Sequence, residues 1–211
     1  MRPGYRPAAL SGGNIVLKIL ALSAAAALVA APVLAAPLPG APPVIPPSKI
    51  VSAASGAWTD DGSVGRAVLI DDDDNASVDL VIYSGNSVNP DQGLKLTAFA
   101  HDIASSGNMM GNTAELRQTQ KGALQIYSEN MAIGRDKWER TMTLAYRGGH
   151  FVVAGLTMSA FDDLKPNSGV SCDLNFLSGV GKLGKKTLKI AAGGVPVEKW
   201  TEDMIPVACQ G

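Results

Sequence analysis

A run of acidic residues is the part of this sequence whose residue types and spacing could bind a metal ion. Residues 70–80 read Ile-Asp-Asp-Asp-Asp-Asn-Ala-Ser-Val-Asp-Leu, between two apolar stretches. Calcium prefers about six to eight oxygen ligands, and a loop with oxygens at alternate positions can surround the ion. We therefore predict a calcium site in which four side chains and one backbone carbonyl, that of residue 77, contribute oxygens. Its ligands would be Asp71, Asp73, Asn75, Ser77 and Asp79.

A solvated acidic turn explains the same residues without a metal. The sharp turn of a calcium loop favours glycine at its sixth position, where this chain has Ala76. Asp72 and Asp74 fall between the predicted ligands and are surplus to them. Charges at a hairpin tip also protect a sheet edge from pairing with other chains. The sequence leaves both interpretations open.

A second polar group surrounds an aromatic residue. Arg135, Lys137 and Trp138 lie together in a segment that could bind a sugar or a peptide, although a long hairpin loop has a similar composition. Arg140 follows on a face that is otherwise apolar. A buried arginine must be paired, and Glu115 or Asp162 is the partner we expect.

We predict no catalytic residues. The two histidines, His101 and His150, cannot make a three-histidine zinc site, and no G-x-S-x-G nucleophile motif is present. His101 and Asp102 are adjacent on an expected strand and should point to opposite faces. His150 is expected to be an exposed turn residue. An envelope hydrolase that uses two carboxylates remains an alternative.

Another alternative is a periplasmic inhibitor of a lytic enzyme. Such an inhibitor would insert a basic loop into an acidic cleft. The basic residues that could serve are Lys182, Lys185 and Lys186.

The elements that must position these residues have the period of two that is typical of half-buried strands. Residues 138–147 alternate between apolar and polar side chains, and Gly148-Gly149 predicts a type I′ turn into a more apolar central strand at 150–161. Lys121-Gly122 predicts a two-residue hairpin loop. We expect one antiparallel all-β domain over residues 51–211. The pattern does not distinguish a sandwich from a barrel or blade-like sheets.

The N-terminus predicts export. Residues 1–35 have a basic start, an apolar stretch and small residues at the end, as in a signal peptide, and no stable membrane span is expected after cleavage. Residues 36–50 form a proline-rich linker that we expect to be disordered. Three of the 18 basic residues belong to the leader, which leaves 15 against 19 acidic ones, a net charge of −4. That balance does not favour nucleic-acid binding.

Cys172 and Cys209 are the two cysteines of the chain. In an oxidising compartment an even pair predicts a disulfide. They lack the C-x-x-C spacing of a redox or zinc motif, which favours a structural bond over a reactive thiol.

Two stretches carry a resemblance to known proteins, residues 128–164 and the Ser-Cys-Asp-Leu-Asn-Phe-Leu-Ser-Gly-Val-Gly-Lys segment at 171–182. They resemble a family of uncharacterised exported bacterial β-rich proteins. Residues 67–83 resemble a degenerate FG-GAP hairpin, whose calcium loop follows D-x-D-x-D-G-x-x-D. The resemblance implies a periplasmic or secreted β-rich domain and no particular substrate. We therefore expect a non-enzymatic binding or structural domain, whose partner is an envelope component or an exported protein.

Overall fold

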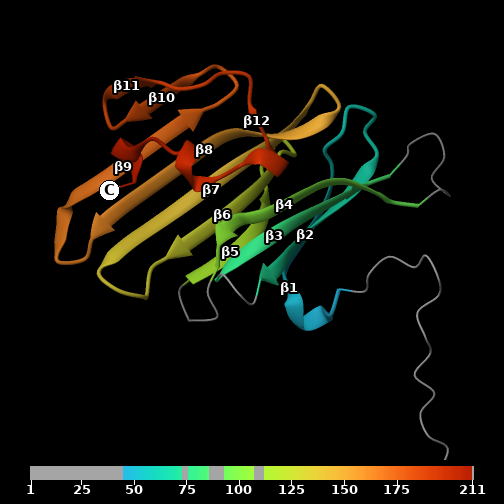
Figure 1. Cartoon of the computed structure of the whole chain (residues 1–211), viewed down its shortest axis with the longest axis horizontal. Helices are drawn as coiled ribbons and strands as arrows, with labels where there is room; N and C mark the ends of the chain where they lie inside the picture. The colour runs from blue at the N-terminus through green and yellow to red at the C-terminus, as the bar shows by residue number, and fades with distance from the viewer. Residues whose placement is uncertain (1–44, 73–75, 86–92, 107–111, 211) are drawn as a thin grey trace, which may run out of the picture. The chain divides into compact units, whose positions relative to one another are not determined.

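The computed structural model describes residues 45–72, 76–85, 93–106 and 112–210, with the side chains of 166 and 167 left aside (Figure 1). The predicted signal peptide, most of the predicted linker, Asp73 and Asn75 lie outside these residues. Within them the chain forms antiparallel strands and short 3-10 turns, which confirms the prediction of an all-β fold. None of the helices described here is long and apolar enough to cross a membrane.

The first sheet, sheet A, has the strand order β1-β2-β3-β4. A 3-10 turn, η1 (Pro47–Lys49), precedes it at the end of the predicted linker. Apolar residues alternate along β2, β3 and β4, so that these strands share one buried face, whereas β1 is at most half-buried. The strands are β1 (Ile50–Ala57), β2 (Val64–Asp72), β3 (Ser77–Ser84) and β4 (Lys95–Ser105).

The second sheet, sheet B, has the order β11-β10-β9-β8-β7-β6-β5, and β12 pairs with β8 beyond the end of β9. Each strand of the path follows its neighbour in sequence, as in a meander. Its strands are β5 (Asn112–Gln118), β6 (Leu124–Asn130), β7 (Asp136–Arg147), β8 (His150–Asp162), β9 (Lys165–Asn175), β10 (Val180–Leu183), β11 (Lys186–Lys189) and β12 (Val195–Pro196).

The β7–β8 hairpin forms as the sequence predicts. Gly148 and Gly149 have φ angles of 58° and 87°, and Arg147 pairs with His150 across the turn. These angles are those of a type I′ turn, which favours glycine because side chains strain the left-handed region. Residues 151–154 are buried on both faces, as expected of a central strand.

The β5–β6 hairpin corrects a prediction. Its loop is not the two residues Lys121-Gly122. The backbone N–H of Thr119 donates to the Ala123 carbonyl, and these two residues enclose a loop of three. Gly122 has a φ of 84° and is the last residue of a turn in which its N–H donates to the Thr119 carbonyl. A three-residue loop with glycine in the left-handed position is the common alternative to the two-residue turn.

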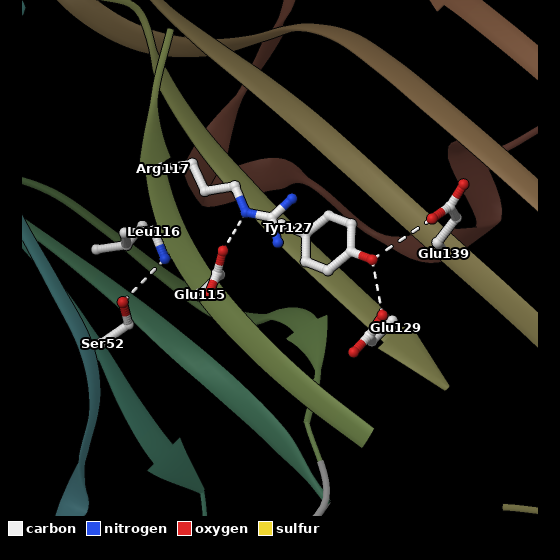
Figure 2. A network of polar contacts seen from close by, with 7 residues as sticks. All are labelled: Ser52, Glu115, Leu116, Arg117, Tyr127, Glu129 and Glu139. Carbon is white, nitrogen blue, oxygen red and sulfur yellow. Dashed lines mark hydrogen bonds and ion pairs between the residues drawn. The ribbon is translucent and has the colours of Figure 1, made fainter. Parts of the chain in front are cut away.

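The two sheets pack on one shared hydrophobic core, which makes the domain a β-sandwich. At one corner the backbone N–H of Leu116 in β5 donates to Ser52 Oγ in β1, so a side chain joins the two sheets where no ladder does (Figure 2). The largest fully buried side chains come from both sheets and include Leu69, Leu80, Ile82, Leu124, Ile126, Phe151 and Leu174.

Residues 197–210, the C-terminal segment, begin beside β4 of sheet A and continue over the core face of sheet B to β9. The segment contains the turns η3 (Val197–Lys199), η4 (Glu202–Met204) and η5 (Val207–Cys209), and Figure 1 shows these turns in red against the strands β7–β9. Trp200 packs edge-on against Phe176 at 5.5 Å between ring centroids. A disulfide joins Cys209 to Cys172 of β9, as predicted, and both residues are buried.

Removing this bond should destabilise the domain strongly. The bond spans a sequence separation of 37 residues, and loop-closure entropy for such a loop corresponds to about 3–4 kcal/mol. We expect the double variant Cys172→Ala with Cys209→Ala to melt roughly 10 °C below the wild type in calorimetry. Thiol titration of the denatured wild type is the control and should find no free thiol. An unchanged melting temperature would contradict the account.

Candidate functional site

Three carboxylates meet at one end of sheet A. Asp72 ends β2, Asp79 lies in β3 and Asp102 lies in β4, and one oxygen from each lies within 4.8 Å of the others. The chain bulges at this point of β4: Asp102 has a φ of 48°, and the register shifts between the pairs of Val78 and Leu80. The bulge turns Asp102 toward Asp79.

Hydrogen bonds fix the geometry of this acidic cluster. Asp79 Oδ1 accepts the Asp102 backbone N–H at 3.1 Å, and Asp79 Oδ2 lies 3.2 Å from His101 Nδ1. The Ser77 hydroxyl donates to Asp102 Oδ1. Oxygen ligands at this spacing suit a hard cation such as calcium, because the ion would relieve the repulsion between the carboxylates.

The structure brings only part of the predicted calcium loop into this cluster. Asp71 pairs with the buried Val78, whereas Asp79 pairs with Ile70, so Asp71 and Asp79 lie on opposite faces of sheet A. Asp72, which the sequence analysis treats as surplus, and Asp102, which it considers only as the neighbour of His101, lie with Asp79 instead. Ala76 has a φ of 50°, the conformation for which calcium loops use glycine.

A groove lies over β7, β8 and β9 at the far end of sheet B. It is a cavity of about 270 Å³ on the face of the sheet that elsewhere packs against the core. Trp138 and Arg140 of β7 lie on this face beside Met158 and Ala160 of β8. Val170 of β9 and Gln210 of the C-terminal segment also line the groove. A cavity with an apolar floor and a few polar groups is typical of a small-ligand site, although this one is small.

Arg140 stands at the inner end of this groove. Its guanidinium lies over the Trp138 ring at 4.7 Å, and its Nη1 donates to Glu202 of the C-terminal segment. The expected partners Glu115 and Asp162 are therefore wrong. Glu115 pairs with Arg117 and Asp162 with Arg135. The Nε of Arg140 is buried and has no acceptor among the described residues.

The other two predicted binding residues take different roles. Arg135 forms a two-pronged ion pair with Asp162, and this hydrogen bond lowers the pKa of the Asp162 carboxyl below its ordinary value. Lys137 is 8% exposed and its Nζ donates to the Gly134 carbonyl at 2.8 Å. Both side chains stabilise the loop before β7. Trp138 is the predicted residue whose side chain lies on the groove face.

The outer face of sheet B carries a network of polar side chains (Figure 2). The Arg117 guanidinium lies 3.4 Å from the centroid of the Tyr127 ring. The Tyr127 hydroxyl donates to Glu129 at 2.7 Å and lies 3.4 Å from Glu139. Glu129 and Glu139 are directly opposite each other on β6 and β7. Their shared donor reduces the repulsion that two opposed carboxylates would otherwise have.

The basic residues of the inhibitor hypothesis lie on the β10–β11 hairpin. Gly184 and Lys185 form its two-residue turn, and Lys182 and Lys186 flank it on the strands. All three lysines are exposed. Lys186 is on the outermost strand of the sheet, where lysines also prevent pairing with other chains, so this position does not by itself indicate a partner.

Comparisons of the chain with protein-family models, curated proteins and solved structures found no match. The resemblance to FG-GAP hairpins and to an exported family therefore stays a prediction.

Sequence reasoning missed the residues that complete the groove. Met158, Val170 and Gln210 are distant from Trp138 in sequence and reach it through strand pairing and the disulfide. One signal was available, namely the charge of Arg140 on an apolar face. That signal located the inner end of the groove but could not identify its partner.

The Tyr127 network predicts a pH dependence. Burial first, and then the hydrogen bond to Glu129, raise the pKa of Tyr127 from 10.0 to about 12. Because the native state favours the protonated phenol, this stabilisation is complete below pH 10 and is lost as the pH rises through about 12. We expect Glu129→Gln to lower the Tyr127 pKa in an ultraviolet absorbance titration. The Tyr127→Phe variant assigns the signal, and a pKa unmoved by Glu129→Gln would contradict the network.

Proposed function

We propose that this chain is an exported, non-enzymatic binding domain of the bacterial cell envelope that holds a ligand, or a side chain of a partner, in the groove over β7–β9. The observation that supports this most is the groove itself. There the apolar face of sheet B continues past the part covered by sheet A and the C-terminal segment. Trp138 is half-buried in it and Arg140 contributes a charge. Exposed apolar surface with a few polar groups is typical of binding sites.

The hydrolase alternative names no particular carboxylates, and the opposed pairs that the structure offers do not favour it. Glu129 and Glu139 share a hydrogen-bond donor, but they are on the open outer face of sheet B and not in the groove. A glycosidase needs paired carboxylates that flank a bound sugar in a cleft that excludes water. Asp136 and Asp162 do line the groove and lie opposite each other, but Arg135 holds Asp162 in an ion pair that lowers the pKa of its carboxyl, which opposes a role as general acid. These placements favour binding over catalysis.

The export part of the proposal has separate support. The leader has the three-part pattern of a signal peptide. The disulfide between Cys172 and Cys209 fits an oxidising compartment, since such bonds are rare in the cytosol.

Photo-crosslinking in the producing cells tests the groove. Ser168 and Ser171 are both exposed serines of β9, but Ser168 lines the groove and Ser171 pairs with Ser159 on the other face. A photoreactive residue at position 168 should yield an adduct that Trp138→Ala abolishes, and the same residue at 171 should not. Intact-mass analysis beginning at Ala36 checks export. Equal adducts at both positions, or none at 168, would reject the groove as the binding site.

We further propose that calcium stabilises sheet A through Asp72, Asp79 and Asp102. The distance of at most 4.8 Å between their oxygens supports this. Calcium at ten times its dissociation constant would add about 1.4 kcal/mol, which corresponds to a rise of roughly 3–5 °C in melting temperature. We expect this rise in calorimetry when calcium replaces a chelator.

Matched aspartate variants distinguish the calcium loop predicted from the sequence, which includes Asp71, from the cluster of Asp72, Asp79 and Asp102. Asp79→Asn and Asp102→Asn should each abolish the calcium-dependent rise. Asp71→Asn should preserve it, because Asp71 lies on the opposite face of the sheet. A melting temperature that does not respond to millimolar calcium would leave the solvated acidic turn as the better explanation.

A further inference from the structure

The groove is polarised along its length. Asp136, Trp138 and Arg140 alternate along β7 and so share one face. At about 3.3 Å per residue, the α-carbons of Asp136 and Arg140 are about 13 Å apart. The groove thus has a cationic inner end at Arg140, an apolar middle formed by Trp138, Ala160 and Val170, and an outer end of mixed charge at Asp136, Lys137 and Asp162.

The inner end has hydrogen-bonding capacity left over. A guanidinium has five N–H donors in a planar fork. Among the described residues, Arg140 has one acceptor, Glu202 on Nη1, while its Nε is buried with none. The side chain of Arg140 is 18% exposed, whereas that of Glu202 is 52% exposed. Water therefore screens Glu202 more than Arg140, and a second carboxylate can share the guanidinium.

The outer end, as far as the structure describes it, offers no free cation to an anion. Arg135 is paired with the Asp162 carboxylate, and Lys137, which also lines the groove, donates its Nζ to the Gly134 carbonyl. Asp136 is exposed beside them, so the charges at this end balance. Arg140 therefore makes the inner end the one that attracts an anionic group.

We propose that the groove binds a monocarboxylate with an apolar body, with the carboxylate on Arg140 and the body over Trp138, Ala160 and Val170. This inference rests on the proposed function and specifies its ligand class. A free acid with an apolar chain and the C-terminal carboxylate of an apolar peptide share this chemistry.

Titration calorimetry with matched probes tests the charge of the ligand. Decanoate should bind the mature wild-type protein at least about tenfold more tightly than 1-decanol or decylamine, because it alone pairs with Arg140. Decanedioate should bind more weakly than decanoate, because its second carboxylate would lie where Arg135 and Lys137 already have acceptors. Equal binding of decanoate and decanol would overturn the proposal, and so would tighter binding of decanedioate.

Two variants with opposite expected effects test the residue. Arg140→Gln should weaken decanoate binding about tenfold or more, and Glu202→Gln should strengthen it severalfold by removing the competing carboxylate. Glu202→Gln retains Arg140 and keeps the test valid if Arg140→Gln does not fold. Arg147→Gln, an exposed arginine at the other end of β7, is the matched control and should leave binding unchanged. Unchanged affinity in Glu202→Gln would contradict the assignment.

Peptide probes distinguish the two sources of the carboxylate, a free acid and the C-terminus of a peptide. N-acetyl-Ala-Leu-Phe with a free carboxyl group is compared with its C-terminal amide and with decanoate. Tighter binding of the acid peptide than of decanoate indicates a polypeptide ligand, and the reverse order indicates a free acid. Either order supports the monocarboxylate class if the amide binds more weakly.

The failure of this inference can be told apart from failure of the proposed function. If decanol and the peptide amide bind as well as the acids, and Trp138→Ala abolishes that binding, the groove is a binding site for neutral apolar ligands and the carboxylate proposal is wrong. If none of the probes binds at millimolar concentration, the monocarboxylate proposal is overturned. The crosslinks at Ser168 then decide the proposed function independently.

Discussion

The unequal size of the two sheets is the constraint on which the rest of this structure depends. Four strands of sheet A must cover the apolar face of a sheet whose path has seven strands. An apolar face left in water loses the free energy that burial would provide, so the chain needs another cover for β7–β9. The C-terminal segment provides it with Val197, Trp200, Ile205 and Cys209, all of which are buried.

The same segment explains why stability and the candidate site are linked. Short 3-10 turns have little stability of their own, so this segment depends on its attachments. Besides the packing of its buried side chains, it is held by the disulfide to Cys172 and by the pair between Glu202 and Arg140. Gln210, next to Cys209, lines the groove, and Arg140 stands at its inner end. The cover therefore ends where the groove begins, and its two anchors also position the groove.

Sequence reasoning succeeded where local chemistry decides the structure. The two glycines at 148 and 149 define the β7–β8 hairpin, because a type I′ turn needs the left-handed region at both positions. The choice of a sandwich did not follow, since it depends on which faces meet across long sequence separations. The partner of Arg140 was missed for the same reason, because Glu202 lies 62 residues away. Asp102 was missed because a bulge changes the alternation on which strand predictions rely.

The central claim is that the end of sheet B left uncovered by the C-terminal segment is a binding groove. Mapping of backbone amide chemical shifts by NMR during a titration with decanoate tests it most directly. The account predicts progressive shifts confined to the neighbourhood of Trp138, Arg140, Met158, Val170 and Gln210. Shifts on the outer face around Tyr127, or an unchanged spectrum throughout the titration, would contradict it.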